Sequence, residues 1–217
     1  PQLGSARTMA TARRGPAGLT TSEEDYLKAV YLLTEWEDTE VGTGALADQL
    51  GLSPASATAM VQKLAAKHLV HHVPRGAITL SGTGRREALR MVRRHRLLET
   101  FLRDELGYGW DEVHDEAEAL EHTVTDRFIN ALEARLGHPR HDPHGDAIPS
   151  AEGELPVSGA IRLDRFSGAR AVIDRISDED PQFLRRAAAQ GLVPGAVIEL
   201  PHQLDFIEAS LIWVRKA

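Results

Sequence analysis

Residues 44–68 read GALADQLGLSPASATAMVQKLAAKH and predict two short helices joined by a tight turn. Gly51 ends the first helix, because glycine readily adopts the left-handed conformation that closes a helix. Ser53 then caps the second helix, and Pro54 fills its first position, where a backbone N–H is not needed. The inner face of the second helix is apolar and consists of Ala57, Val61, Leu64 and Ala65. The stretch is typical of a helix-turn-helix.

The flanking sequence completes a winged domain. A helix is predicted to start at Thr21 or Ser22, where a hydroxyl cap precedes the acidic residues that favour a helix N-terminus. Beyond residue 68, the stretches 69–73 and 77–80 alternate like two strands around a Pro-Arg-Gly turn. This hairpin predicts a wing next to the second helix.

The rest of the chain is predicted to be helical first and then β. Helices are expected from Ser81 or Thr83 to Leu106, over 110–123 and over 125–136. Residues 137–156 are rich in Pro, Gly, His and Asp and are interpreted as a linker. From Val157 onward the β pattern returns in four short runs, which a helix interrupts at residues 181–190. These runs predict a small β-barrel.

The predicted fold class is mainly α with a small β part. Four segments follow: a disordered tail or tag over 1–20, a winged helix-turn-helix over 21–84, a helical domain over 85–149, and a linker with a small β domain over 150–217. Residues 1–8 are interpreted as an expression scar before a native start at Met9.

Composition narrows the functional classes. The 217 residues contain no cysteine, which excludes disulfides and thiolate metal sites and suits a reducing cytoplasm. No apolar run reaches the roughly 18 residues of a membrane span. The net charge of −7 is uneven: residues 43–96 carry nine Lys/Arg against two acids, and residues 97–154 carry four Arg against fifteen acids. The basic segment suits a phosphate backbone, and the acidic one suits metal cations.

The second helix of the helix-turn-helix is predicted to enter the DNA major groove by its N-terminal end. The side chains there are small and mostly hydroxylic, so they permit phosphate contacts and contact with thymine methyl groups. Lys63 and the wing-tip Arg75 are predicted phosphate or minor-groove contacts. The predicted DNA-binding residues are Ser53, Pro54, Ala55, Ser56, Thr58, Lys63 and Arg75.

Two helical segments carry the residues of a metal site. In RHRLLE, residues 94–99, His95 and Glu99 are four apart and share a helix face. In HDEAEALEH, residues 114–122, two imidazoles and two carboxylates at positions 114, 118, 121 and 122 fall within an arc of about 100°. Packed carboxylates repel one another, and a divalent cation neutralises them.

Two other functions remain open on the residues alone. A metal-independent winged-helix regulator would use the acidic helix only as a solvated or structural face, and its DNA binding would ignore a chelator. A metal-dependent hydrolase would use Glu118 or Glu121 as a base. The hydrolase is disfavoured, because the chain lacks a His-Glu-x-x-His motif, a phosphate-binding loop and a nucleophile elbow.

The combined motifs resemble the diphtheria toxin repressor family of metal-dependent regulators, in its manganese-type branch with a C-terminal SH3-like (FeoA-like) domain. The resemblance rests on the helix-turn-helix together with EDYL at 24–27, RHRL at 94–97, VHDEA at 113–117 and EH at 121–122. Residues 176–183 (ISDEDPQF) and 191–195 (GLVPG) resemble the SH3-like part. The resemblance implies a repressor, not an enzyme, that binds palindromic operator DNA as a homodimer when metal is bound. It implies that residues 85–149 form the dimerisation and metal-sensing domain and that residues 150–217 form a linker and the SH3-like domain.

The resemblance also implies two metal sites per protomer. The primary site would use Asp25, Glu118, Glu121 and His122. The ancillary site would use His95, Glu99 and His114, with Glu179 and Gln182 from the SH3-like domain. Oxygen ligands at 25 and 118, where iron-responsive members carry Met and Cys, imply Mn(II), with Fe(II) as the alternative. Manganese-type members that lack the SH3-like domain carry a carboxylate at the position of Lys28, so this chain departs from them there. In addition, the chain after Leu200 is shorter than the family's SH3-like fold.

Two consequences are expected. Metal would tie the first helix, through Asp25, to the dimerisation helices and so set the spacing of the two recognition helices. The dimer seam is predicted on the apolar face of the 111–136 helices, including Phe128, Ile129 and Leu132. Neither a membrane nor a small-molecule substrate is expected as a partner.

Overall fold

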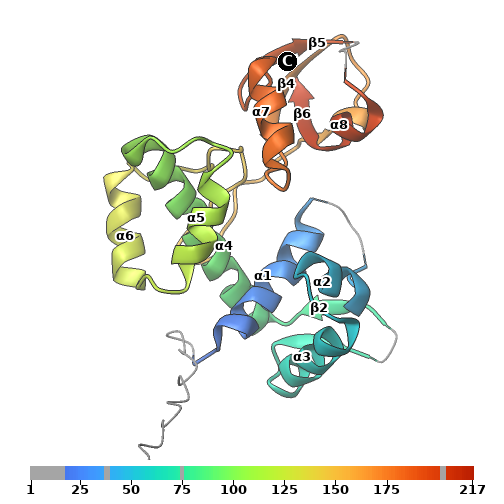
Figure 1. Ribbon diagram of the computed structural model, residues 1–217, viewed down its shortest axis with the longest axis vertical. Helices are drawn as coiled ribbons and strands as arrows, with labels where there is room; N and C mark the ends of the chain where they lie inside the picture. The colour runs from blue at the N-terminus through green and yellow to red at the C-terminus, as the bar shows by residue number, and fades with distance from the viewer. Residues whose placement is uncertain (1–17, 37–39, 74–75, 201–203) are drawn as a thin grey trace, which may run out of the picture. The chain divides into compact units, whose positions relative to one another are not determined.

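The computed structural model describes residues 18–36, 40–73, 76–200 and 204–217. It divides into two compact units, residues 1–89 and 90–217. Figure 1 labels the helices and most of the strands of the two units. Among the described residues no helix combines the length and apolar character that a membrane span needs. The predicted tail over residues 1–17 and the wing-tip Arg75 lie outside the described residues.

The first unit is the predicted winged helix-turn-helix. It contains α1 (Thr21–Glu35), α2 (Thr43–Gln49), α3 (Pro54–Ala66), β1 (Val70–His72) and β2 (Ile78–Leu80). The strands pair antiparallel with Val70 opposite Leu80. α1 packs on α2, α3 and β2 around a core whose fully buried side chains include Leu27, Leu46, Ala57 and Leu64.

The helix starts follow from capping. Thr20 caps α1 and forms a capping box with Glu23, one residue before the predicted start. The hydroxyl of Ser53 accepts the backbone N–H of Ser56 at 3.1 Å, and Pro54 opens α3 as expected. Each cap satisfies a backbone N–H that has no partner within its helix. The predicted starts are therefore confirmed to within one residue.

The second unit begins within the long helix α4 (Gly82–Leu106), which is followed by α5 (Val113–Glu121) and α6 (Asp126–Arg135). Their apolar faces form one core from Leu97, Leu98, Leu102, Val113, Ala117, Ile129, Leu132 and Ile148. Ile129 and Leu132 are therefore buried within their own unit, while Phe128 is exposed. The predicted dimer seam needs correction: of its three named residues, Phe128 alone faces outward.

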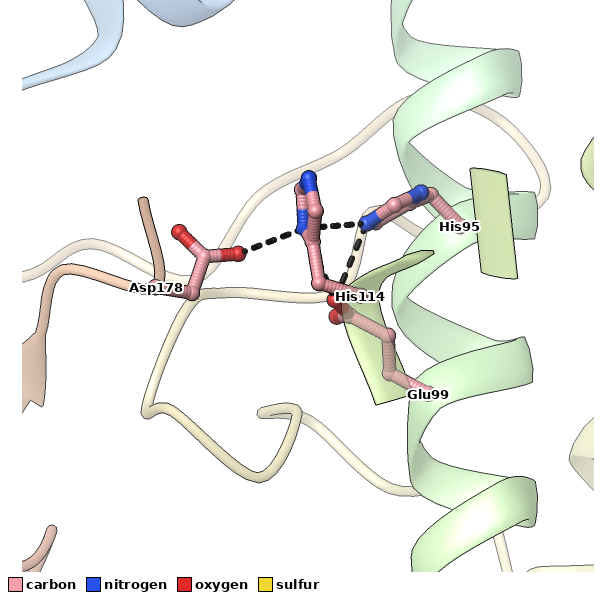
Figure 2. A group of neighbouring side chains, drawn as sticks. All are labelled: His95, Glu99, His114 and Asp178. Carbon is pink, nitrogen blue, oxygen red and sulfur yellow. Dashed lines mark hydrogen bonds and ion pairs between the residues drawn. The ribbon is translucent and has the colours of Figure 1, made fainter. Parts of the chain in front are cut away.

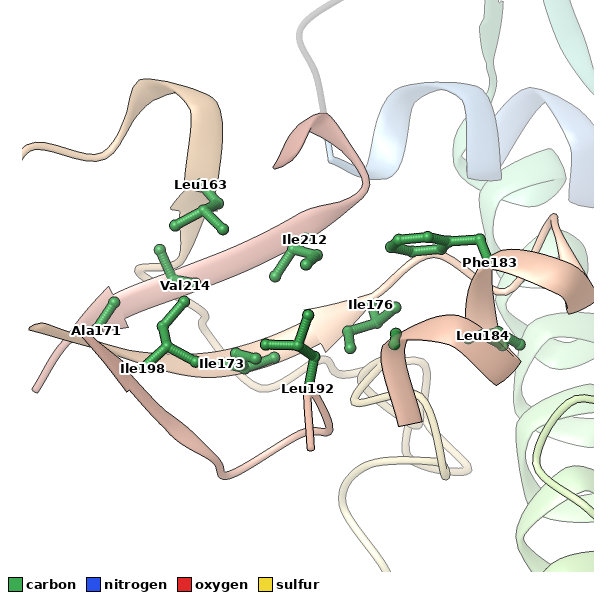
Figure 3. Close-up of a cluster of buried hydrophobic side chains, with 11 residues drawn as sticks. Leu163, Ala171, Ile173, Ile176, Phe183, Leu184, Leu192, Ile198, Ile212 and Val214 are labelled. Carbon is green, nitrogen blue, oxygen red and sulfur yellow. The ribbon is translucent and has the colours of Figure 1, made fainter. Parts of the chain in front are cut away.

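The C-terminal part of this unit is a four-stranded antiparallel sheet in the order β3-β6-β4-β5. It comprises β3 (Ile161–Arg162), the short 3₁₀ turn η1 (Leu163–Arg165), β4 (Arg170–Ile176), α7 (Pro181–Ala189), β5 (Val197–Glu199), α8 (Phe206–Ser210) and β6 (Ile212–Lys216). Figure 3 shows the apolar side chains of the sheet gathered with Phe183 and Leu184 of α7 into one cluster. The strand after residue 200 is thus present, and β6 pairs with both β3 and β4.

The linker interpretation of residues 137–156 is wrong for its central part. Residues 142–149 are all buried. A Cβ added at Gly145, whose φ is +93°, would lie 2.0 Å from the carbonyl oxygen of Asp174 in β4, so only glycine fits there. The N–H of Ile176 donates to the carbonyl of His144 at 2.9 Å. Close packing against β4, rather than regular secondary structure, orders this segment.

Candidate metal centre

The middle of α4 buries several of its charged and titratable residues. Arg94 and Glu99 are each at most 1% exposed, and His95 is 7% exposed. The guanidinium of Arg94 donates to Asp126 at 2.5 Å, which leaves the imidazole of His95 to face α5. Charged groups are rarely buried unless they are paired or bind metal, so this helix face is a candidate site.

The two ring nitrogens of His95 connect two groups of ligands. Nδ1 lies 2.7 Å from Oε2 of Glu121 and 3.7 Å from Oε1 of Glu118, both on α5. Nε2 lies 2.9 Å from Oε1 of Glu99, one turn along α4. Glu121 is fully buried, and its other oxygen lies 3.4 Å from Nε2 of His122. His95 therefore stands between the residues predicted for the primary site and those predicted for the ancillary site.

Asp178, which was not predicted from the sequence, lies with His95, Glu99 and His114, the residues predicted for the ancillary site; these four are called the ancillary group. His95, Glu99, His114 and Asp178 each offer a ligand atom within 4.8 Å of the others. Figure 2 shows His114 between Asp178 and His95, with the carboxylate of Glu99 below its ring. Nδ1 of His114 lies 3.1 Å from Asp178 and 3.4 Å from Glu99. The run Ser-Asp-Glu-Asp at 177–180 was the available signal, but it offers three acids and does not say which turns inward.

The other predicted residues are placed as follows. Glu179 and Gln182 are exposed, although both follow Asp178 closely in the chain. Asp25 lies half-buried on α1 in the first unit, and Glu118 is partly exposed on α5 in the second. Lys28, the departure noted in the sequence, is buried on α1.

Glu99, His114 and Asp178 shift one another's pKa values. Burial opposes the charge of Glu99, but His95 and His114 outweigh it and hold the pKa of Glu99 well below its usual range. Burial would likewise lower the pKa of His114, yet hydrogen bonds to Asp178 and Glu99 raise it to about 11. Burial also opposes the charge of Asp178, and His114 holds its pKa well below the usual range. A cation entering this group would have to displace the proton of His114.

The predicted DNA-reading residues lie on α3. Ser53, Pro54, Ala55 and Ser56 are all exposed at its N-terminal end, and the hydroxyl of Thr58 donates to the carbonyl of Pro54 at 2.8 Å. A groove of about 610 Å³ is lined by residues of α3 and its surroundings, including Thr58, Gln62 and His72.

Lys63 is less free than expected. Its amino group lies 2.9 Å from Oε1 of the buried Glu23, which Lys67 also contacts at 2.6 Å. Burial opposes the charge of Glu23, but the two lysines and the N–H of Thr20 outweigh it and lower the pKa of Glu23 to about 2.

Three family models match the chain in the order of this architecture. They are "Iron dependent repressor, N-terminal DNA binding domain" over residues 18–78, "Iron dependent repressor, metal binding and dimerisation domain" over 81–150 and "FeoA domain" over 166–207. The iron-dependent repressor IdeR of Mycobacterium leprae is 30% identical over 191 residues, which cover 82% of this chain and 83% of the relative. The chain belongs to the diphtheria toxin repressor family. It is a metal-dependent transcriptional repressor with a FeoA domain at its C-terminal side.

Another family member and two solved structures are also similar to this chain. The diphtheria toxin repressor of Corynebacterium glutamicum is 32% identical over 154 residues, covering 71% of this chain and 66% of that protein. A solved "manganese-dependent transcriptional repressor complex with manganese" is 43% identical with a TM-score of 0.85 and covers 88% of this chain and 98% of its own. ScaR with bound Cd²⁺ is 31% identical with a TM-score of 0.77, covering 90% and 99%. The family consists of repressors, so the hydrolase alternative is set aside.

Proposed function

We propose that this family member is a manganese-responsive, homodimeric repressor that binds palindromic operator DNA in the cytoplasm when two metal sites per protomer are filled. The observation that carries the proposal is the connected cluster around His95. Its ring contacts Glu121 on one side and Glu99 on the other, at 2.7 and 2.9 Å. An imidazole between buried carboxylates is a donor set suited to a divalent cation.

The residues fit such an ion. Glu99 is fully buried, and its Oε2 has no hydrogen-bond partner among the described residues, so one strong acceptor is left for a ligand. The ancillary ion would be held by His95, Glu99 and His114 with Asp178, in place of the expected Glu179 and Gln182. Each bound cation would supply positive charge that draws the carboxylates together.

The primary ion would be held by Asp25, Glu118, Glu121 and His122. Asp25 belongs to the first unit and the other three to the second, so an ion held by all four would couple the DNA-binding unit to the sensor. This coupling shifts a population of orientations rather than creating a new fold. Oxygen ligands at positions 25 and 118 favour Mn(II) over metals that prefer soft sulfur ligands. The concentration of each metal in the cell decides between Mn(II) and Fe(II).

The DNA contacts are proposed at Ser53, Pro54, Ala55, Ser56 and Thr58 on α3, with Lys63 and Arg75 on phosphates. The exposure of the α3 N-terminal end supports this assignment. Lys63 would have to exchange its contact with Glu23 for a phosphate, and Lys67 could retain the buried carboxylate. The match to a dimerisation domain supports two copies on a two-fold operator.

The test is DNA binding to a genomic fragment library with Mn(II), with Fe(II) under anaerobic conditions, or with chelator. Selective binding with Mn(II) and none with chelator is expected, the two metals at matched free concentration identify the cation, and Asp25→Ala should lose the metal-dependent binding while remaining a dimer. Glu116→Ala, which removes an exposed acid of α5, is the matched control and should bind as the parent does. Equal binding with metal and with chelator would instead support the metal-independent regulator.

A further inference from the structure

Glu23 on α1 is a buried carboxylate that two lysines of α3 share. Its side chain is 0% exposed, and the Nζ atoms of Lys63 and Lys67 lie 2.9 and 2.6 Å from its Oε1. Its Oε2 accepts the backbone N–H of Thr20 at 3.0 Å, which fixes the carboxylate at the start of α1. Two cations thus face one anion, so Glu23 stays paired when one of the two lysines leaves.

The two lysines differ in how easily they can leave Glu23. They are four residues apart on α3 and so share a face. Lys63 has the longer contact and the more exposed side chain, 49% against 39%. A buried carboxylate that loses both cations is strongly unfavourable, whereas an exposed lysine loses little when it changes partners. Lys67 can therefore remain at Glu23 while Lys63 moves to another anion.

Lys63 is also closer than Lys67 to the end of α3 that is proposed to read DNA. Lys63 follows Ser56 by seven residues and Lys67 follows it by eleven, so at about 100° per residue all three lie on one side of the helix. With a rise of about 1.5 Å per residue, Lys63 is about 10 Å and Lys67 about 16 Å along the axis from Ser56. Because the N-terminal end of this helix approaches the DNA in a helix-turn-helix, a phosphate reaches Lys63 first.

We propose that Glu23 is a specificity-determining residue for DNA binding. It retains Lys63 on non-operator DNA and releases it where the operator holds a phosphate close, while Lys67 keeps the buried carboxylate paired. A lysine that already has a carboxylate partner gains less from a phosphate than a free lysine does, so loosely bound DNA is weakened more than the operator complex. The inference rests on the proposed function, because Lys63 acts there as a phosphate contact.

The experiment measures DNA binding of the full chain at saturating Mn(II) over a range of salt concentrations. The two probes are the fragment selected from the genomic library and a fragment of the same length with shuffled sequence. Each phosphate contact contributes about 0.9 to the slope of log affinity against log salt concentration. Lys63→Met should therefore lower the slope on the selected fragment by about one.

Lys67→Met should lower this slope by about the same amount, because Glu23 then retains Lys63. Adding Glu23→Gln to Lys67→Met should restore the slope and the affinity of the parent, since an uncharged side chain releases Lys63. A glutamine at position 23 can still accept the N–H of Thr20, so the start of α1 is kept. A purely structural role predicts the opposite, because the double variant would then be the weakest binder.

Glu23→Gln alone tests the effect on specificity. It should bind the shuffled fragment several-fold more tightly than the parent does and change binding to the selected fragment less, so the ratio of the two affinities falls. Asp48→Asn, which removes a negative charge from an exposed position on α2, is the matched control and should keep the ratio of the parent. Circular dichroism checks that each variant is folded.

An unchanged slope in Lys63→Met or Lys67→Met, or an unchanged ratio in Glu23→Gln, would overturn the inference. A slope that stays low in the double variant would also overturn it and would make Lys67 itself a phosphate contact. These outcomes leave the metal-dependent repressor in place. A parent that binds both fragments equally, with Mn(II) and with chelator, would instead overturn the proposed function.

Discussion

α3 and α4 are both amphipathic by sequence, yet they bury different chemistry. α3 buries Ala57, Val61 and Leu64 and leaves its polar side chains exposed or on the surface. α4 buries the consecutive charged residues 93–96 and then Glu99. An apolar anchor needs only to exclude water, whereas each buried charge needs a partner. α3 is thus built to present a surface, and α4 is built around interactions that a bound cation can change.

The largest effect is expected where a buried charge loses its partner on the α4 side. Arg96→Met should lower the free energy of unfolding by about 3 kcal/mol, because it leaves Asp142 and Asp146 with less positive charge. Lys63→Met on α3 should cost less than about 1 kcal/mol, since that side chain is 49% exposed and Lys67 still contacts Glu23. Urea denaturation in chelator measures both. Equal losses would remove the proposed distinction between the two helices.

Loss of His95, which lies between Glu121 and Glu99, should strongly weaken the metal-dependent binding of DNA. His95→Ala is expected to weaken Mn(II)-dependent operator binding by at least about 100-fold, because it removes a ligand and the link between Glu121 and Glu99. The measurement is a fluorescence anisotropy titration of operator DNA at fixed free Mn(II). Glu116→Ala serves as control, and operator affinity that survives His95→Ala would argue that the cluster is only structural.

Metal affinity should rise with pH. The pKa of His114 is raised to about 11, so its proton is retained at neutral pH and competes with the metal. Affinity for Mn(II) should increase by up to about tenfold per pH unit for each displaced proton between pH 6 and 9. His138→Gln, at an exposed histidine, should keep the same slope. A flat profile by calorimetry would exclude imidazole ligation.

Without metal, the raised pKa of His114 should make the free energy of unfolding fall as pH rises, whereas the affinity for metal rises with pH. A raised folded-state pKa stabilises the fold fully below the ordinary histidine value, and that contribution is lost as pH rises toward about 11. In chelator, the parent should therefore lose part of its stability between pH 7 and 10, while a His114→Gln variant should lose less. Thermal melts at matched ionic strength check this, and identical losses would contradict it.

A small effect, confined to the first unit, is expected at a cap on α3. Ser53→Ala should destabilise the first unit by about 1 kcal/mol, because the N–H of Ser56 loses its acceptor. The Mn(II) affinity of the ancillary site should stay unchanged, since the ligands proposed for that site lie in the other unit. Ser56→Ala, which leaves the cap in place, is the matched control. A change in metal affinity in Ser53→Ala would show that the two helices are not independent.

Local sequence features were enough to predict the helices of the first unit and the shared face of His95 and Glu99. Hydroxyl caps, Pro54, Gly51 and the 3.6-residue period set the helices of the first unit, and the spacing of His95 and Glu99 put both on one face of α4. These features act within one or two turns of chain, so the sequence alone was sufficient to predict them.

The tertiary structure decided which acid reaches the ancillary group and what residues 142–149 do. Asp178, Glu179 and Gln182 are close in sequence, but the packing of the β-sheet part turns Asp178 toward His114 and leaves the other two exposed. The buried loop around His144 has neither helical nor strand periodicity, so composition made it resemble a linker. Burial of an irregular segment depends on what packs against it, here β4 at Gly145, and no local pattern encodes that contact.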